Sequence, residues 1–293
     1  MTMAEPRGLG KITSKRWGGL IIGLATALVA TGACGGTSGT DGDLIASMKQ
    51  AGCATVALAE APPFSTITTD GKAGGYVPAV TQEVLAKLGV PGLCVKPATY
   101  DAMIPGLQAG TFDALPGGLN ITPERCAAIA FSQPVTAQHE ALAVPKGNTH
   151  RITDYAGLAR NPELRLAVFS GSSQEAFAKK SGVRQSQLVT VPDSQTGISA
   201  VKSGRADAFG AGQFTLRRVA DDSMEVIVDT SSPVSMIGIG FRKRDTAARD
   251  AFDAQLEQMR KSGALGALYA KFGFPNPEEI KDISRSSVSQ ACA

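Results

Sequence analysis

Short apolar runs alternate with amphipathic stretches along most of the chain. Apolar runs of strand length occupy residues 54–59, 93–98, 112–118, 166–169, 188–191 and 206–211. Stretches with apolar residues at helical spacing occupy residues 77–89, 103–110, 123–130, 173–180, 196–204 and 246–263. Strands that alternate with helices predict the α/β class, with mostly parallel sheets covered by helices on both faces.

The alternation is interrupted around residues 139–147 and then starts again, which predicts two α/β lobes. The chain later leads back into a long helical pattern, so we expect the second lobe to be inserted into the first. Lobe 1 is predicted to consist of residues 51–140 and 236–293, and lobe 2 of residues 141–235. Two crossing hinge strands would join the lobes.

The first 33 residues are typical of an export signal. Four basic residues precede an apolar run at 17–33 that is shorter than the ~20 residues of a membrane-spanning helix. The run ends in ATGAC, which resembles a bacterial lipoprotein signal, with Thr31 where an aliphatic residue is usual. We therefore expect removal of residues 1–33, lipidation of Cys34 and a tether over residues 34–50. Cleavage without lipidation, which would leave a periplasmic protein, is the alternative.

The charge balance changes once the export signal is set aside. The chain has 29 basic and 26 acidic residues, and residues 1–33 hold four and one of these, which leaves 25 of each. A neutral mature chain indicates neither a nucleic-acid partner nor a polybasic patch for membrane lipids.

Four cysteines besides Cys34 are expected in an oxidising compartment: Cys53, Cys94, Cys126 and Cys292. An even number permits three pairings. Because Cys53 and Cys94 each begin an apolar strand-like run, we favour their pairing, and we favour Cys126 with Cys292. The chain has no CxxC motif and its two histidines are far from these cysteines in sequence, so no metal site is expected.

Arg125 stands in the first turn of a predicted helix that begins with Thr122 as N-cap and Pro123 at its first position. The helix dipole disfavours a cation there by roughly 0.3 to 1 kcal/mol unless an anion joins it. A bound carboxylate would make the arrangement favourable, because free N–H groups and the guanidinium would then face one charge. A solvated surface arginine is the alternative.

Other candidate binding residues also follow predicted strands. Ligands of open parallel sheets bind beyond the carboxyl ends of the strands. The residues found there are Glu60, Phe64, Tyr100, Asn120, Arg125, Gly171 and Ser172. An arginine for a carboxylate, with an acid and aromatic faces for a cation, suits a small zwitterion. Each has a structural alternative: Ser172 and Glu175, for example, form an S-x-x-E capping box that needs no ligand.

No enzyme signature is found. The sequence lacks a G-x-S-x-G elbow, an H-E-x-x-H motif, a phosphate-binding G-x-x-x-x-G-K and a dinucleotide glycine fingerprint. No catalytic residue and no cofactor are therefore predicted. A general acid at Glu60 is the one enzymatic role that stays open.

The stretch GLQAGTFDALPGGLNITPERCAAIAFSQP, with GRADAF at 204–209 and GFRKRD at 240–245, resembles the family 3 solute-binding proteins of bacterial ABC importers. The resemblance implies a type II periplasmic-binding-protein fold in which Arg125 of the T-x-x-R segment clamps a ligand carboxylate. IPGLQAG, ITPERC and a cysteine near the C-terminus are most similar to the ectoine and hydroxyectoine binders. In those proteins an acid and an aromatic cage surround the ligand cation. Glu60 matches the position of the acid, and Phe64 and Tyr100 match two positions of the cage.

Two positions depart from the patterns of this family. Asn120 stands where a third cage aromatic is expected, and Gly212 stands where amino-acid binders place an aspartate. The resemblance thus implies a small zwitterionic ligand, either an ectoine-like solute or a polar amino acid. The predicted ligand-binding residues are Glu60, Phe64, Tyr100, Asn120, Thr122, Arg125, Gly171, Ser172 and Thr196.

The function that this resemblance implies is an extracytoplasmic substrate-binding protein, anchored to the outer face of the cell membrane through Cys34. It would act as a monomer and deliver its ligand to an ABC permease after hinge closure. Two alternatives are an enzyme on the same fold, similar to cyclohexadienyl dehydratase, and a ligand sensor.

Overall fold

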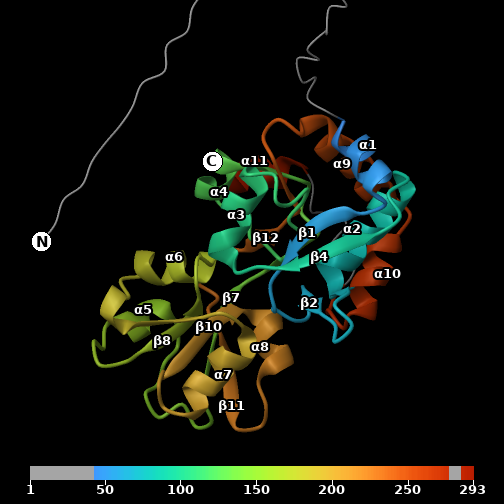
Figure 1. Cartoon of the computed structure of the whole chain (residues 1–293). Helices are drawn as coiled ribbons and strands as arrows, with labels where there is room; N and C mark the ends of the chain where they lie inside the picture. The colour runs from blue at the N-terminus through green and yellow to red at the C-terminus, as the bar shows by residue number, and fades with distance from the viewer. Residues whose placement is uncertain (1–42, 277–284) are drawn as a thin grey trace, which may run out of the picture. The chain divides into compact units, whose positions relative to one another are not determined.

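The computed structural model describes residues 43–276 and 285–293. The predicted export signal and Cys34 lie outside the described residues. The helices are α1 Leu44–Ala51, α2 Tyr76–Lys87, α3 Tyr100–Gln108, α4 Pro123–Ala128, α5 Tyr155–Ala159, α6 Ser173–Lys180, α7 Ser194–Lys202, α8 Gln213–Val219, α9 Thr246–Lys261, α10 Ala264–Lys271 and α11 Arg285–Ala291, with a 3-10 turn at Gln185–Gln187 (Figure 1). The strands are β1 Ala54–Leu58, β2 Thr66–Ile67, β3 Ala73–Gly74, β4 Leu93–Pro97, β5 Ala130–Phe131, β6 Thr136–Gln138, β7 Glu140–Pro145, β8 Leu166–Phe169, β9 Leu188–Val191, β10 Ala208–Gly212, β11 Met224–Val228, β12 Ser235–Ile237 and β13 Gly240–Phe241.

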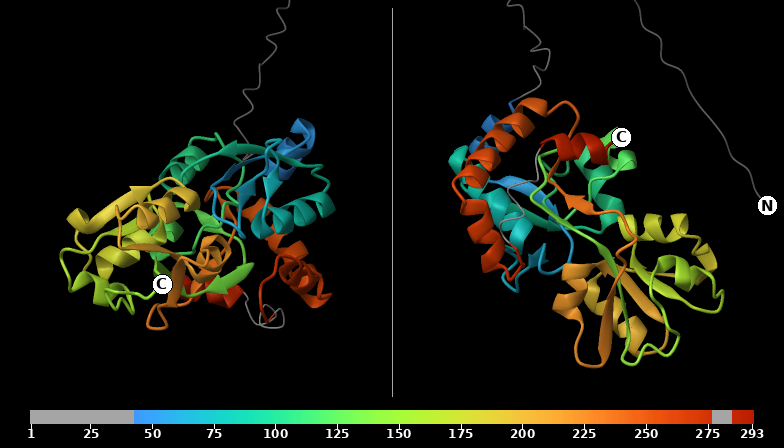
Figure 2. Two further views of the ribbon diagram at one scale, coloured as in Figure 1. Left: turned by 90° about the horizontal axis from the view of Figure 1, so that it is seen from below. Right: turned by 180° about the vertical axis from the view of Figure 1, so that it is seen from behind.

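The first lobe is built on the parallel pair β1 and β4. Helices α1, α2, α9 and α10 contribute to the apolar core beside this pair, and Figures 1 and 2 show them along one side of it. In α9 the buried residues Phe252, Leu256 and Met259 recur at the predicted helical spacing, so one face of the helix enters the core.

The tether expected over residues 34–50 is wrong for its last part, because residues 44–51 form helix α1. Asp43 caps this helix by accepting a hydrogen bond from the backbone N–H of Ile45 at 3.1 Å. Leu44, Ile45 and Met48 are buried in the core of the first lobe. Apolar residues at this helical spacing bury the segment rather than leaving it in solvent.

Of the strand and turn predicted over residues 112–118, the turn forms, but the strand is reduced to single bridges. Only isolated bridges form there, from Ala114 to Val56 and from Leu115 to Gly240. The physical reason is that Pro116 lacks an N–H and is followed by two glycines, of which Gly118 has a positive φ of 79°. The chain therefore turns toward α4 instead of continuing along the sheet.

The second lobe is a five-stranded sheet in the order β11-β7-β10-β8-β9. The pairs β10–β8 and β8–β9 are parallel as predicted, whereas β7 and β11 run antiparallel to their neighbours. Alternate residues of β7 enter different clusters: Leu142 packs with α5 and α6, and Ala143 packs with α7 and α8. Helices therefore cover both faces of this sheet.

Two segments of chain connect the lobes. The first runs from β6 into β7, and the second returns from β11 to β12. Strands β6 and β12 pair antiparallel, with Gln138 opposite Ser235. This two-lobed arrangement confirms the predicted fold class, whereas the residue limits of each lobe stay a prediction.

Two disulfides tie the first lobe. Cys53 pairs with Cys94 at the start of β1 and β4, and Cys126 of α4 pairs with Cys292, which follows α11. This is the pairing that the sequence favours.

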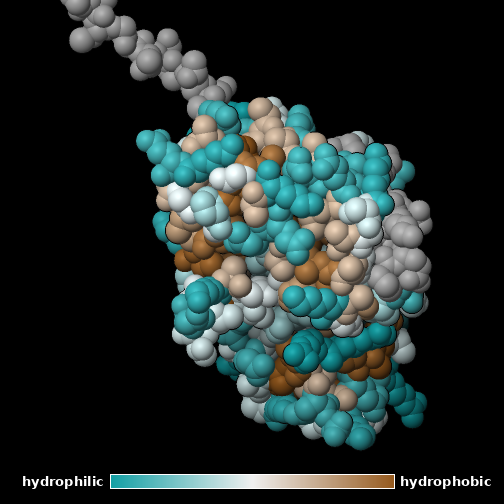
Figure 3. Space-filling view, turned by 90° about the vertical axis from the view of Figure 1, so that its right-hand side faces the viewer, coloured by the Kyte–Doolittle hydropathy of each residue, from teal (hydrophilic) through white to brown (hydrophobic). Residues whose placement is uncertain are grey.

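Hydrophilic residues cover much of the face shown in Figure 3, with small apolar groups between them. Among the described residues, no helix has the length and apolar character needed to cross a membrane.

Candidate ligand-binding site between the two lobes

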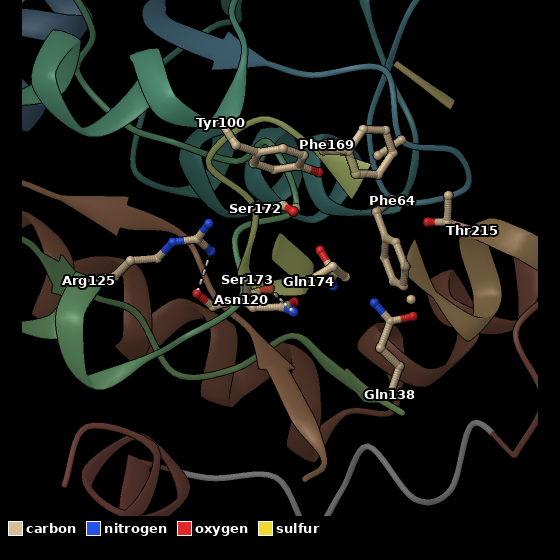
Figure 4. Close-up of a pocket in the computed structure, with 13 residues that line it drawn as sticks. Phe64, Tyr100, Asn120, Arg125, Gln138, Phe169, Ser172, Ser173, Gln174 and Thr215 are labelled. Carbon is tan, nitrogen blue, oxygen red and sulfur yellow. Dashed lines mark hydrogen bonds between the residues drawn. The ribbon is translucent and has the colours of Figure 1, made fainter. Parts of the chain in front are cut away.

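A small cavity lies where the loops of the first lobe meet the second lobe (Figure 4). Its walls come from the loop after β1, the starts of α3 and α6, the segment before α4 and the ends of β6, β8 and β10. The lining residues are Ala61, Phe64, Tyr100, Gly118, Asn120, Arg125, Gln138, Phe169, Ser172, Ser173, Gln174, Gly212 and Thr215. Five of them belong to the predicted set: Phe64, Tyr100, Asn120, Arg125 and Ser172.

Arg125 places a partly buried guanidinium at this cavity. Thr122 caps α4 by accepting a hydrogen bond from the Arg125 backbone N–H at 3.3 Å. The guanidinium donates to the carbonyl oxygens of Asn120 at 2.9 Å and Gly171 at 3.1 Å, so both lobes hold it. Arg125 is therefore not a solvated surface side chain.

Glu124 and Glu140 lie near enough to act on the charge of Arg125, but neither forms an ion pair with its guanidinium. Burial lowers the pKa of Arg125 to about 10, because the cation loses water around it. None of the described residues forms an ion pair with it, and its two hydrogen-bond acceptors are neutral carbonyl groups. A ligand carboxylate at this point would gain charge-assisted hydrogen bonds.

Three aromatic rings line the cavity. Phe64 and Tyr100 were predicted, and Phe169 at the end of β8 was not. The rings of Tyr100 and Phe169 lie 5.7 Å apart between centroids and join the two lobes. Burial raises the pKa of Tyr100 to about 12, so its hydroxyl stays protonated at neutral pH. Phe169 thus supplies a third aromatic ring, which was expected at position 120, where this chain has an asparagine.

The end of β10 shows why position 212 is a glycine. A Cβ on Gly212 would lie 2.1 to 2.3 Å from the side-chain amide atoms of Gln138, so no side chain fits there with Gln138 in place. The cavity thus has an uncharged amide beside Gly212.

Glu140, the first residue of β7, lies directly behind the cavity. It is buried, and its carboxylate accepts hydrogen bonds from Gln174 and Ser235, both at 2.7 Å, and from Asn120 at 3.3 Å. Burial raises its pKa above the usual value for a glutamate. Sequence inspection missed this residue, because it stands where the alternation of elements breaks and follows no predicted strand.

The family model for bacterial extracellular solute-binding proteins, family 3, matches residues 54–275. This chain belongs to that family. The assignment confirms the resemblance found in the sequence, and the family is one of solute-binding proteins.

Three similar proteins illustrate the range of the family. A probable amino-acid ABC transporter periplasmic-binding protein of Sinorhizobium fredii is 30% identical over 257 residues, covering 84% of this chain and 85% of that protein. The crystal structure of EhuB in complex with hydroxyectoine has a TM-score of 0.80 and 35% identity, covering 85% of this chain and 97% of EhuB. An ancestral amino acid-binding protein, a precursor of cyclohexadienyl dehydratase, has a TM-score of 0.71 and 29% identity, covering 78% and 98% of the two chains.

Four residues predicted for this family 3 protein do not line the cavity. The Glu60 carboxylate accepts a hydrogen bond from the Ile67 backbone N–H at 2.6 Å. Thr196 stands in the first turn of α7, where its N–H is capped by Asp193 at 2.7 Å. Thr122 and Gly171 line a neighbouring cavity on the far side of the Arg125 side chain.

Gly171 has a structural role that only the folded chain reveals. Its φ is +68°, and a Cβ there would lie 2.6 to 2.7 Å from the backbone and Cβ of Asp101. A glycine therefore allows the loop before α6 to approach α3, and it brings the carbonyl of residue 171 to Arg125.

The structure adds seven cavity residues with polar or small side chains that are absent from the predicted set: Ala61, Gly118, Gln138, Ser173, Gln174, Gly212 and Thr215. Ser173 and Gln174 directly follow the predicted Ser172, so extending the candidate set into the first turn of α6 would have included them.

No metal-binding group of three histidine, cysteine or acidic residues occurs in residues 43–276 and 285–293.

Proposed function

We propose that this solute-binding protein captures a small zwitterion in the cavity between its lobes and delivers it to an ABC permease in the membrane. Its family supports the transport role. The observation that carries the ligand class is Arg125, a partly buried cation whose hydrogen-bond acceptors are two neutral carbonyl groups and which forms no ion pair with a described residue. A ligand carboxylate supplies that partner.

The other end of the ligand faces a different environment. Phe64, Tyr100 and Phe169 offer aromatic faces, and none of the 13 lining residues is an aspartate or glutamate. A delocalised cation is held by aromatic faces with about 0.5 to 2 kcal/mol per contact, whereas a compact ammonium gains more from a carboxylate. We therefore favour an ectoine-like solute over a standard amino acid. The similarity to EhuB, solved with hydroxyectoine, supports this choice.

Hinge closure is the proposed capture step. The hydrogen bonds that join the two lobes include those from Arg125 to the Gly171 carbonyl at 3.1 Å, from Asn120 to the Ser173 hydroxyl at 2.7 Å, from the Ser194 hydroxyl to the Glu60 carbonyl at 3.1 Å and from the Ser170 hydroxyl to the Asp101 carboxylate at 3.1 Å. Bending of the β6–β7 and β11–β12 connections would separate these partners and open the cavity. Ligand contacts with both lobes would then favour the closed form that the permease recognises.

The direct test is isothermal titration calorimetry of the purified, ligand-stripped full-length chain with ectoine, hydroxyectoine, glycine betaine and a panel of polar amino acids. Tight binding of ectoine or hydroxyectoine supports the proposal. Binding of an amino acid alone would show that the cavity accepts an ammonium without a lining carboxylate, and the ligand class would then be wrong.

We also propose that the protein is a receptor and not an enzyme or a sensor. A receptor returns its ligand unchanged, which mass spectrometry of the released ligand checks after prolonged incubation. Conversion of the ligand would instead indicate a dehydratase-like enzyme. Uptake of labelled ligand that depends on this protein separates transport from signalling.

Replacing Tyr100 with leucine should weaken the binding of ligands with a delocalised cation by about two- to thirtyfold, which corresponds to roughly 0.5 to 2 kcal/mol. A ligand held mainly through its carboxylate should lose much less, because Arg125 is retained. Calorimetric titration of both ligand types measures this selectivity. An equal loss for every ligand would mean that Tyr100 only shapes the cavity.

The anchor at Cys34 is a separate proposal, supported by the ATGAC sequence at the end of the export signal. Replacing Cys34 with alanine should move the protein from the membrane fraction to the soluble extracytoplasmic fraction, because the acylated residue is gone. Fractionation followed by immunoblotting measures the shift. An unchanged distribution would contradict lipid anchoring.

A further inference from the structure

The cavity needs hydrogen-bond acceptors for the cationic part of a zwitterion, yet it has no lining carboxylate. Its polar side chains include three amides, Asn120, Gln138 and Gln174. An amide has an acceptor at one end and donors at the other, so its orientation decides which kind of ligand group it can bind. Whatever fixes these orientations therefore influences specificity.

Glu140 contacts two of these three amides from outside the cavity. Its Oε2 accepts from Gln174 Nε2 at 2.7 Å, and its Oε1 accepts from Ser235 Oγ at 2.7 Å and from Asn120 Nδ2 at 3.3 Å. The three donors come from α6, from β12 and from the segment before α4. The Glu140 side chain is buried and does not line this cavity, although it lines the neighbouring cavity beside Thr122 and Gly171.

An ionised carboxylate can only accept hydrogen bonds, so both amides must turn their NH₂ groups toward Glu140. Asn120 uses Nδ2 a second time, for the Ser173 hydroxyl at 2.7 Å. Its carbonyl oxygen, like that of Gln174, is then left for other partners. Figure 4 shows the Gln174 oxygen on the side of the cavity that faces Tyr100 and Ser172, with its nitrogen turned away.

We propose that Glu140 is a positioning residue that sets the hydrogen-bond polarity of the cavity. It holds the NH₂ groups of Asn120 and Gln174, so that their carbonyl oxygens accept the N–H groups of the ligand cation. This inference rests on the proposed zwitterionic ligand. Together with Arg125, it gives the cavity one end that donates to a carboxylate and one end that accepts from N–H groups.

The ionised form of Glu140 is required, because a protonated carboxyl also donates and would let an amide reverse. Burial raises the pKa of Glu140, and hydrogen bonds from Ser235 and Gln174 lower it. Of the other titratable groups that face it, Arg125 lowers this pKa and Asp229 raises it, and Tyr155 lies close enough to be influenced by Glu140. Affinity for a ligand with N–H donors should therefore fall as the pH falls through the raised pKa.

The test compares ectoine, whose ring cation carries N–H groups, with glycine betaine, whose quaternary ammonium has none. Calorimetric titrations of the full-length chain would use wild type, Glu140→Gln and the control Glu225→Gln. Glu225 is a half-buried residue of β11 that does not line the cavity, and its carboxylate accepts from the Gly147 N–H. In Glu140→Gln we expect ectoine to bind at least tenfold more weakly than in wild type and betaine to bind within about twofold of wild type. The decrease in ectoine affinity at low pH should also disappear in this variant. The control should match wild type.

Three outcomes would overturn the inference. An equal loss for both ligands in Glu140→Gln would indicate a purely structural role, and unchanged ectoine binding would indicate no role. If wild type binds neither ligand, the proposed ligand class itself is wrong and the inference falls with it. Should Glu140→Gln fail to fold, Gln174→Met removes the proposed acceptor at similar length, and the same selective loss of ectoine is expected.

Discussion

Replacing Arg125 with alanine should weaken binding of a carboxylated ligand by at least about 30-fold. Loss of one partner of a buried charge pair costs about 2 kcal/mol or more, because the other charge is left without compensation. The two carbonyl groups that now accept from Arg125, those of Asn120 and Gly171, would also lose their partner. Calorimetric titration of the ligand-stripped protein measures the change in the dissociation constant.

Two further variants separate the role of Arg125 from general damage. Arg125→Lys keeps the charge but not the planar fork, so we expect partial retention of affinity. Arg205→Ala removes an exposed arginine that does not line the cavity and should bind as wild type does. Melting temperatures near the wild-type value would show that Arg125→Ala still folds. Unchanged affinity in that variant would refute the carboxylate clamp.

Most helices and strands could be predicted from the sequence, because apolar periodicity and capping residues are local patterns. The helix at 173–180 has its predicted N-cap in Ser172, which accepts from the Glu175 N–H at 3.1 Å. The strand at 166–169 is buried at every position, as a continuous apolar run predicts. The strand and turn predicted at 112–118 form only in part, because the proline and glycines that make the turn limit the strand to single bridges.

The candidate site shows where such reasoning ends. Residues at strand ends could be selected from the sequence, and Phe64, Tyr100 and Arg125 do meet at one cavity. The direction of a loop side chain could not be derived, so Glu60 was expected at the cavity but contacts the Ile67 backbone instead. Glu140 acts through contacts with residues 20, 34 and 95 positions away, and no local pattern encodes such contacts.

The disulfide beside Arg125 leads to the largest expected effect on stability. Cys126 follows Arg125 in α4, and its bond to Cys292 joins positions 166 residues apart. The α11 residue Val288 also packs in the apolar cluster that contains Ile121 and Ile129, on either side of α4. Replacing both cysteines with serine should therefore lower the free energy of unfolding by about 2 to 4 kcal/mol, through a less constrained unfolded chain.

For a chain of this size, that loss corresponds to a decrease of roughly 5 to 15 °C in melting temperature. Circular dichroism is the suitable probe, because the only tryptophan, Trp17, lies in the predicted export signal. The matched control is Cys53→Ser with Cys94→Ser, whose positions are 41 residues apart. Its shorter loop should make the loss smaller by about 1 kcal/mol on the chain-entropy model.

Ligand affinity distinguishes the two cysteine pairs further. Without the Cys126–Cys292 bond, α4 loses its covalent link to the segment after α11, so Arg125 should be less well positioned and affinity should fall a few-fold. The Cys53–Cys94 bond joins the starts of β1 and β4, and neither cysteine lines the cavity, so its removal should leave affinity unchanged. If removal of the Cys126–Cys292 bond leaves ligand affinity unchanged, this disulfide does not position Arg125 in α4. If both variants lose the same stability, the difference in loop length has no effect.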